Sequence, residues 1–375
     1  MKLGILGGGQ LARMLAMAAH PLGIETVFVD PSPQAPARVV GESLVAAYDD
    51  RDMLMAMAGR VDIATYEFEN VPDEAARALA SAVRLLPPPE ALRVSQDRVI
   101  EKQTLASLGV PTPAFRAVDD RAALSDAVAA LGAPCVLKTR RFGYDGKGQA
   151  VIRNTDASAL DRAWQLVGAG RVPCILEGFV AFDRELSQLA ARAASGEVRF
   201  YPLVQSRHDR GVLRETIAPA PSTSAAIESL ARGHVQRLLE HLDYVGVIAL
   251  ELFQIGDALF ANEFAPRVHN SGHWTIEGAE TSQFENHVRA VCGLPLGSTG
   301  ALGRSAMLNL LGDVPASADV LAIRGAHLHL YGKSAAPWRK LGHLTLVERS
   351  GETDFDARLA QLRALVDASI VAPDA

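Results

Sequence analysis

The stretch that decides the fold covers residues 245–274 and reads VGVIALELFQIGDALFANEFAPRVHNSGHW. An apolar run interrupted only by Glu251 leads to Gly256-Asp257, and a second apolar run then ends at Glu263. Two apolar runs that flank a Gly-Asp pair predict a β-hairpin. Because side chains alternate along a strand, the two glutamates share a face if the loop has three residues or a strand carries a bulge. A regular two-residue loop would put them on opposite faces.

The two glutamates are the first candidate site. Burying two carboxylates in so apolar a setting is costly without a cation to neutralise them. Oxygen ligands of this kind suit Mg²⁺, which bridges protein carboxylates and substrate phosphates. The alternative is that both are solvent-facing acids on an edge hairpin. The segment after the hairpin, APRVHNSGHW, favours the metal site because it gathers Arg, His and Asn in an irregular loop of the kind that carries function.

The composition is that of an ordinary soluble globular protein with two or three domains. The 375 residues are 49% hydrophobic and 21% charged, and the net charge is −6. This balance argues against nucleic acid or an anionic membrane as a partner, so a phosphate site has to be built locally. We expect no signal peptide or membrane span. Cys135, Cys174 and Cys292 are expected to be reduced core residues of a cytoplasmic protein.

The N-terminal residues predict a Rossmann-like unit. A short strand runs into the glycine-rich turn Gly7–Ala12, a helix follows, and a second strand over residues 24–29 ends at Asp30. A G-x-G-x-x-A turn with an acid about twenty residues later is typical of dinucleotide sites. We interpret the turn as holding some anion at a helix N-terminus. The alternative is an NAD-dependent oxidoreductase, which leaves Glu251, Glu263 and the glycine-rich loop described next without a role.

Residues 133–149 predict a phosphate-binding lid. An apolar strand ends in Lys138, and GYDGKGQ follows at residues 143–149. The glycines predict a mobile loop whose amides close over phosphates, and the lysine supplies a point charge. The alternative is a plain glycine turn beside a surface lysine. The helix predicted just upstream, over residues 97–108, places Arg98 and Lys102 one turn apart.

Proline and glycine clusters divide the chain. Pro87-Pro88-Pro89 marks a first boundary and Gly293-Leu294-Pro295 a second. Short strands at 306–312, 326–330 and 344–347 and a closing helix at 357–366 predict a small β-rich end. We therefore expect three domains, 1–95, 96–295 (with a lid subdomain at about 135–185) and 296–375.

These motifs resemble those of a known enzyme family. Glu251 with NEFAPR at residues 262–267 resembles the metal-binding end of the ATP-grasp ligases. The longer string EFAPRVHNSGHWT, together with GGGQLxRM, GYDGKGQ, NLLG and RKLGH, is similar to the members of that family that carboxylate 5-aminoimidazole ribonucleotide in purine biosynthesis. The resemblance covers nearly the whole chain. Ala12 stands where we expect glycine, and Gly178 where relatives often have a side-chain amide.

The resemblance implies an α/β fold of ATP-grasp architecture, with an N-terminal Rossmann-like parallel-sheet domain and a small C-terminal β-rich domain. It also implies an ATP- and bicarbonate-dependent carbon–nitrogen ligase that acts through carboxyphosphate, with ATP and Mg²⁺ as cofactors. The implied metal ligands are Glu251 and Glu263. The implied catalytic residues are Arg267, His269, Asp145 and Lys138.

The resemblance also implies the residues that contact each substrate. Those for ATP are Arg98, Lys138, Gly143, Tyr144, Asp145, Gly146, Lys147, Gly148, Gln149, Glu177, Gly178, Phe179, Val180, Glu185, His208, Asn262 and Glu263. Those for the ribonucleotide are Gln10, Glu69, Tyr144, Asp145, Asn270, Lys333, Arg339 and Lys340.

The expected partners are small molecules, namely ATP, bicarbonate and 5-aminoimidazole ribonucleotide, and the expected assembly is a homodimer. Within the family, a formate-using or biotin-carboxylating relative is the nearest alternative. A catalytically inactive nucleotide-binding module is another.

Overall fold

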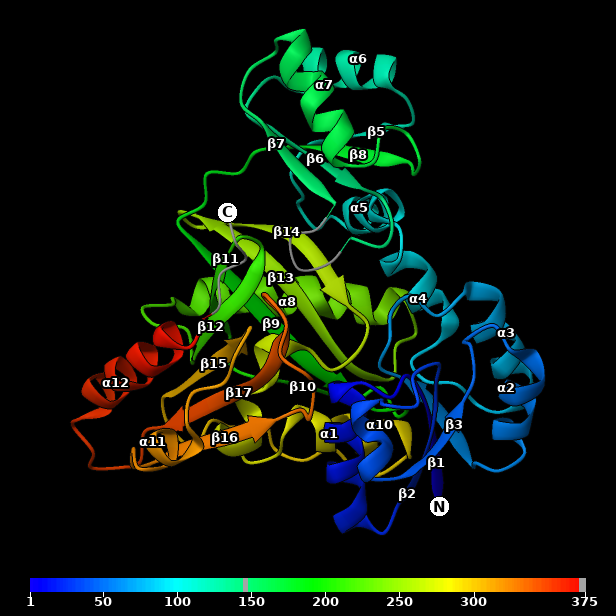
Figure 1. The fold of residues 1–375 in the computed structure, drawn as a ribbon, viewed down its shortest axis with the longest axis vertical. Helices are drawn as coiled ribbons and strands as arrows, with labels where there is room; N and C mark the ends of the chain where they lie inside the picture. The colour runs from blue at the N-terminus through cyan, green and yellow to red at the C-terminus, as the bar shows by residue number, and fades with distance from the viewer. Residues whose placement is uncertain (144–147, 371–375) are drawn as a thin grey trace.

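The computed structural model describes residues 1–143 and 148–370. In these residues the strands form three sheets, and Figure 1 shows how they are arranged. A parallel sheet lies at the N-terminal end, a long mixed sheet forms the body, and a small sheet with two helices projects from the rest.

The N-terminal sheet is parallel and has the strand order β3-β2-β1-β4. β1 (Lys2–Leu6) is apolar and nearly all buried, as expected of a strand covered on both faces. The glycine-rich turn follows it, as the sequence predicted. The other elements of this unit are β2 (Glu25–Asp30), β3 (Glu42–Val45), β4 (Ile63–Tyr66), α1 (Gln10–Ala19), η1 (His20–Leu22), η2 (Pro36–Val39), α2 (Arg51–Ala58), α3 (Asp73–Ala82) and α4 (Pro89–Ser95).

The projecting unit is an antiparallel sheet of order β5-β8-β6-β7. Its core packs two helices on one face of the strands. α5 (Arg98–Ser107) precedes it and lies between this sheet and the central one; Asp97 caps α5 by accepting from the backbone amides of Val99 and Ile100. The elements of the unit are β5 (Phe115–Val118), α6 (Arg121–Leu131), β6 (Cys135–Thr139), β7 (Gln149–Ile152), α7 (Ala157–Leu166) and β8 (Cys174–Gly178).

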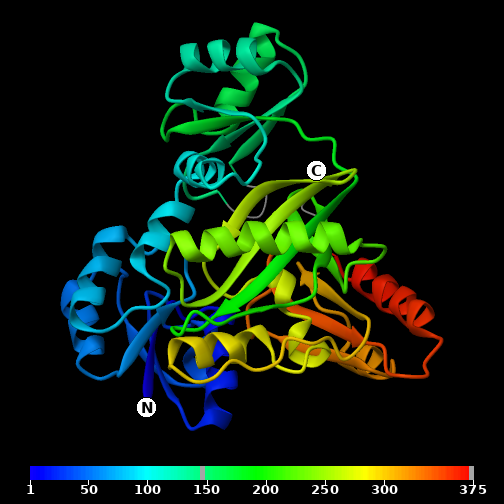
Figure 2. The same cartoon turned by 180° about the vertical axis from the view of Figure 1, so that it is seen from behind.

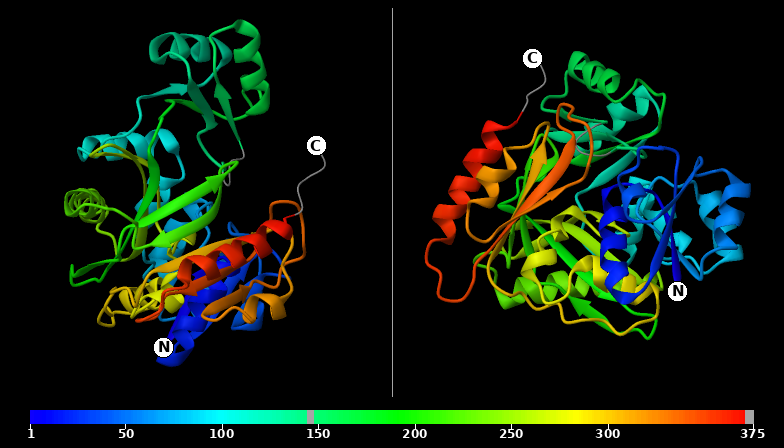
Figure 3. Two further views of the ribbon diagram at one scale, coloured as in Figure 1. Left: turned by 90° about the vertical axis from the view of Figure 1, so that its left-hand side faces the viewer. Right: turned by 60° about the horizontal axis from the view of Figure 1, so that its bottom comes forward.

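The central sheet runs in the order β14-β13-β9-β11-β12-β15-β17-β16, with β10 beside β9. α8 crosses its back face, where it packs on β13 and β14 (Figure 2), and α12 packs along the C-terminal strands (Figure 3). The elements are β9 (Arg184–Arg192), β10 (Val198–Phe200), β11 (Val204–Asp209), β12 (Val212–Ala218), α8 (Ala225–His241), β13 (Gly246–Ile255), β14 (Ala258–Ala265), η3 (Asn270–Gly272), α9 (Thr275–Gly278), α10 (Gln283–Val291), β15 (Ser305–Leu311), α11 (Ser317–Leu321), β16 (Ala326–Leu330), β17 (Lys340–Val347) and α12 (Phe355–Ala368).

The C-terminal strands extend the central sheet, because β15 pairs with β12 along its length. The strands expected near residues 306, 326 and 344 are present, so the predicted β-rich end is confirmed, although it shares a sheet with the preceding domain. β3, β5, β7, β11 and β12 were not predicted. β3 and β5 are short and largely exposed strands in which apolar and polar residues do not alternate clearly.

The central hairpin has a two-residue loop, since Ile255 pairs directly with Ala258. A β-bulge restores the shared face of the two glutamates. The register shifts between Glu251 and Leu252, so that Glu251 lies opposite Glu263 and Asn262 is the extra residue. The bulge, rather than a three-residue loop, therefore brings the carboxylates together.

No helix within residues 1–143 and 148–370 is long and apolar enough to cross a membrane. Cys135, Cys174 and Cys292 are free and buried, as predicted.

Candidate active site

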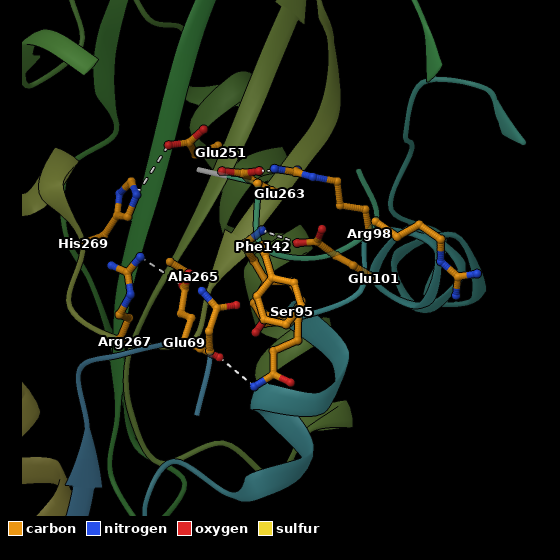
Figure 4. A pocket seen from close by; sticks show the side chains of 15 residues that line it. Glu69, Ser95, Arg98, Glu101, Phe142, Glu251, Glu263, Ala265, Arg267 and His269 are labelled. Carbon is orange, nitrogen blue, oxygen red and sulfur yellow. Dashed lines mark hydrogen bonds and ion pairs between the residues drawn. The ribbon is translucent and has the colours of Figure 1, made fainter. Parts of the chain in front are cut away.

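The paired glutamates open onto a pocket at the junction of the three sheets (Figure 4). The Oε2 atom of Glu263 lies 2.6 Å from the Nη1 atom of Arg98. The Oε1 atom of Glu251 lies 3.5 Å from Nε2 of His269. The Nδ2 amide of Asn262, the bulge residue, donates to the other oxygen of Glu251 at 3.4 Å. The two carboxylates thus stand side by side, with a guanidinium beside Glu263 and with an imidazole and an amide beside Glu251.

The charges of the two glutamates are set by burial and by each other. Burial and the nearby Glu263 raise the pKa of Glu251 to about 7. Burial also acts to raise the pKa of Glu263, but Arg98 outweighs it and lowers that pKa to about 2. Glu251 resists ionisation beside the charged Glu263, and a divalent cation bound between them would stabilise the form in which both are ionised.

The donor set fits Mg²⁺. Within the described ranges no cluster of three or more His, Cys, Asp or Glu side chains could hold a metal, so the protein offers two carboxylates. Mg²⁺ characteristically binds through one or two carboxylates, keeps waters, and takes its remaining ligands from substrate phosphates.

The floor of the pocket carries the residues of the loop that follows the hairpin. Nη2 of Arg267 lies 3.1 Å from Oε1 of Glu69, and its Nη1 donates to the carbonyl of Val268 at 2.9 Å. Burial, with Arg267 nearby, lowers the pKa of His269 to about 3, so this imidazole is neutral. The side-chain amide of Asn270 is buried and its nitrogen and oxygen both lack a hydrogen-bond partner. An unsatisfied buried amide beside these groups suits a polar ligand.

A buried ion cluster lies at the nucleotide end. One carboxylate oxygen of Glu177 is 3.1 Å from Nζ of Lys138 and 3.4 Å from Nζ of Lys102. Burial acts to raise the pKa of Glu177, and the two lysines outweigh it, so the pKa is lowered. Lys138 therefore reaches the site from β6, as the sequence suggested, but it is held there by Glu177.

The expected adenine and ribose residues lie close to this cluster. The amides of Gly178 and Phe179 donate to the carbonyls of Ala114 and Pro134, so an adenine would need other backbone groups of this segment. Val180 is half-buried beside them. The carboxylate of Glu185 lies 2.8 Å from Nδ1 of His208. Burial acts to lower the pKa of His208, but this carboxylate and Glu251 outweigh burial and raise it.

The glycine-rich loop is described only at its ends. Gly143 lines the pocket, Gly148 is the turn residue before the return strand, and Gln149 begins that strand, β7. Tyr144, Asp145, Gly146 and Lys147 lie outside the described residues, so their expected roles stay predictions.

The residues expected at the ribonucleotide come from opposite ends of the chain. Nζ of Lys333, in the loop between β16 and β17, donates to Oε1 of Gln10 at the start of α1 (2.6 Å). Lys340, at the start of β17, lies close enough to His269 to help lower its pKa. Arg339 is exposed and donates to Ser334 of its own loop. The structure thus brings Gln10 and Lys333 together and places Lys340 near His269, whereas Arg339 is exposed.

The glycine-rich turn after β1 binds the protein's own carboxylates. The amide of Gly8 donates to Asp30 and the amide of Gly9 to Glu67, each at 2.8 Å. Burial raises the pKa of Glu67 to about 7. The amides that would hold a dinucleotide pyrophosphate are occupied in this way, which argues against the NAD-dependent alternative.

Several pocket or cluster residues were not predicted from the sequence as site residues, and four of them have ionisable side chains. Glu67 binds the glycine turn, and Arg140 lines the pocket while pairing with Asp97 at 2.8 Å. Glu101 and Lys102 are buried on α5. The sequence signal that could have identified the last two is that Glu101 and Lys102 are charged residues of the helix predicted over residues 97–108, beside its apolar positions.

Three family comparisons agree with this geometry. The ATP-grasp domain family matches residues 103–284 and the ribonucleotide synthetase preATP-grasp domain matches residues 1–96. The phosphoribosylaminoimidazole carboxylase C-terminal domain matches residues 305–354. The three matches follow one another along the chain.

Whole-chain relatives agree as well. An N5-carboxyaminoimidazole ribonucleotide synthase from Pseudomonas aeruginosa is 51% identical over 368 residues, which cover 98% of this chain and 100% of the relative. The crystal structure of the synthetase from Thermus thermophilus is 54% identical, with a TM-score of 0.91 over 97% of this chain and 98% of that one. The enzyme from Aspergillus clavatus, solved with ADP and 5-aminoimidazole ribonucleotide, is 30% identical, with a TM-score of 0.88 over 98% and 97% of the two chains. This chain therefore belongs to the ATP-grasp ligases and, within them, to the N5-carboxyaminoimidazole ribonucleotide synthases.

Proposed function

We propose that this chain carries out its family's reaction, the ATP-dependent carboxylation of 5-aminoimidazole ribonucleotide, with bicarbonate as the carbon source and carboxyphosphate as the intermediate. The observation that carries the proposal is the pocket itself. It presents the facing carboxylates Glu251 and Glu263 together with Arg267 and His269. The carboxylates would hold a metal-bound triphosphate, and the neighbouring Arg267 and His269 would hold a small anion next to it.

At the nucleotide end, Glu251 and Glu263 would hold Mg²⁺, which when bound neutralises charge on the transferring phosphoryl group. Lys138 would pair with the phosphates and Arg98 would keep Glu263 ionised. The segment from Glu177 to Val180 would hold the adenine. The pair of Glu185 and His208 supports a ribose contact, because the carboxylate is fixed by the imidazole.

At the anion end, Arg267 would bind bicarbonate through its planar guanidinium. Neutral His269 and the unsatisfied amide of Asn270 would supply hydrogen bonds. A bicarbonate oxygen attacks the γ-phosphorus and ADP leaves, which forms carboxyphosphate. The amine of the ribonucleotide then takes up the carboxyl carbon and phosphate is released. A closed pocket would protect the intermediate from water.

The ribonucleotide would lie between α1 and the C-terminal loops. Lys333 and Lys340 would bind its phosphate, and Gln10 supports this placement through its contact with Lys333. Glu69 would face the ribose side of the pocket, Arg339 would act from the rim, and Asp145 would orient the amine. The solved relative from Aspergillus clavatus, which contains ADP and 5-aminoimidazole ribonucleotide, supports the proposal that this fold takes both ligands.

The test is phosphate release by the purified chain with Mg·ATP. We expect release to need both 5-aminoimidazole ribonucleotide and bicarbonate, with one phosphate per carboxylated product. Release with formate in place of bicarbonate would favour the formate-using alternative. ATP binding without release would favour an inactive module. A cytoplasmic homodimer also stays a prediction, and sedimentation of the purified chain would test the assembly.

A further inference from the structure

Among the residues that the structure describes, β14 is the edge strand of the central sheet, so its outward backbone groups need partners other than a neighbouring strand. The carbonyl of Pro111 accepts from the amide of Ala261, and two adjacent side chains of α5 provide partners for three further groups. The backbone amide of Phe264 donates to Oε1 of Glu101 at 2.6 Å. Nζ of Lys102 donates to the carbonyl of Asn262 at 2.7 Å and to that of Ala261 at 3.2 Å.

Both side chains are buried, with Glu101 2% and Lys102 0% exposed. Burying charged groups is costly, and apolar residues of similar size would pack at lower cost. Lys102 is partly neutralised by Glu177, 3.4 Å away. That ion pair does not account for the two carbonyl contacts, which use further hydrogens of the same ammonium group.

The groups that these side chains bind surround the β-bulge. Asn262 is the extra residue, and the carbonyls on Lys102 belong to it and to the residue before it. Without the bulge, the two-residue loop would turn Glu263 to the opposite face from Glu251. The contacts from α5 therefore act at the place that decides where the second carboxylate points.

We propose that Glu101 and Lys102 are positioning residues that clamp this bulge and thereby hold Glu263 beside Glu251 for metal binding. The inference rests on the proposed metal role of the two glutamates. Arg98, one turn earlier on α5, pairs with the carboxylate of Glu263. One helix thus orients both the backbone and the side chain of the same ligand.

The test combines a structural and a metal-binding measurement on Lys102→Met, with Gln103→Met as the control because Gln103 is exposed on the same helix. We expect hydrogen exchange in residues 258–265 of the nucleotide-free protein to rise at least tenfold. We also expect Mn²⁺ affinity in the presence of ADP, followed by electron paramagnetic resonance, to fall at least tenfold. The KM for 5-aminoimidazole ribonucleotide should change less than twofold.

Glu101 gives an independent pair of variants if Lys102→Met does not fold. Glu101→Gln keeps an acceptor for the Phe264 amide and should stay within threefold of the wild type in exchange and Mn²⁺ affinity. Glu101→Leu removes the acceptor and should lose Mn²⁺ affinity as Lys102→Met does. Equal behaviour of the two Glu101 variants would contradict the clamp.

Glu263→Gln, measured in parallel, separates the inference from the function on which it rests. Unchanged Mn²⁺ affinity in Glu263→Gln would refute the metal assignment itself. Lost affinity in Glu263→Gln with wild-type exchange and affinity in Lys102→Met would overturn the positioning role alone. Weaker ADP binding by Lys102→Met without faster exchange in residues 258–265 would likewise overturn it, since Lys102 would then serve only Glu177.

Discussion

Arg267 shows at the scale of one residue how a proposed catalytic role and a structural role meet. Its guanidinium contacts Glu69 of the N-terminal unit and the carbonyl of Val268 at the same time. A lysine could keep one of these contacts but not the forked geometry. The ion pair therefore fixes the orientation of the side chain without using all of its donors, which leaves donors for an anion in the pocket.

We predict that Arg267→Lys binds Mg·ATP normally and loses bicarbonate-dependent phosphate release by about tenfold to a hundredfold. That range corresponds to a charge-assisted contact of about 1.5–3 kcal/mol. The measurements are bicarbonate saturation and melting temperature on the same preparation, with the exposed Arg77→Lys as control. A lower melting temperature with unchanged bicarbonate response would make Arg267 a purely structural partner of Glu69.

The glycine turn before α1 gives a prediction at the scale of an element. A Cβ atom on Gly9 would lie 2.7 Å from Oε1 of Glu67, which already accepts from the Gly9 amide. Gly9→Ala should therefore displace this carboxylate and lower the free energy of unfolding by about 1–3 kcal/mol. Gly59→Ala is the matched control, because its Cβ would meet only ordinary contacts at 3.7 Å. Equal stability of the two variants in urea would show that the turn tolerates a side chain.

The loop between β16 and β17 gives a second prediction at the scale of an element. Because Lys333 reaches Gln10 across the site, Lys333→Ala should raise the KM for 5-aminoimidazole ribonucleotide by about tenfold to a hundredfold, the loss of one charge-assisted phosphate contact. The KM for ATP should change less than twofold. The surface variant Lys2→Ala serves as the control in the same steady-state assay. Weakened ATP binding in Lys333→Ala would instead assign this loop to the nucleotide.

At the scale of the whole molecule, His287 joins the N-terminal and central sheets. Its Nε2 lies 2.8 Å from the hydroxyl of Thr65 in β4, and its Nδ1 accepts from the amide of Val247 in β13 at 3.1 Å. The imidazole is completely buried, and burial lowers its pKa to about 3. The native protein therefore holds His287 neutral as the contact between the two units.

This burial makes stability depend on pH with a defined sign. The unfolded chain protonates His287 near pH 6.5 and the folded chain only near pH 3, so its contribution is complete above pH 6.5 and is lost as the pH falls. Between pH 7.5 and 5.5 the wild type should lose about 1.4 kcal/mol more than His287→Gln in urea unfolding. Other buried histidines, such as His234, act equally in both proteins. Parallel pH profiles would contradict a neutral His287.

Local pattern was enough for much of the fold and for the hairpin that carries the paired glutamates. The apolar runs around Gly256-Asp257 predicted the hairpin, because alternation and turn preference act over a few residues. The strand before Lys138 and the glycine turn before α1 were predicted for the same reason. The resemblance to the ATP-grasp ligases, rather than local pattern, predicted Arg267, His269 and Lys333 as site residues, and these roles stay predictions.

The sequence by itself determined the two strands and the turn of the central hairpin, and it placed two glutamates on that hairpin. Only the tertiary structure decided that they face each other. That depends on a bulge whose backbone groups bind two side chains of α5. Glu101 is 163 residues from its partner Phe264, and Lys102 is 160 residues from its partner Asn262. It also decided that the glycine turn binds Asp30 and Glu67, which gives those amides a partner other than a cofactor phosphate. Periodicity reports which face of its own element a residue occupies, whereas register, ion pairing and the satisfaction of buried polar groups depend on which distant segment packs against it.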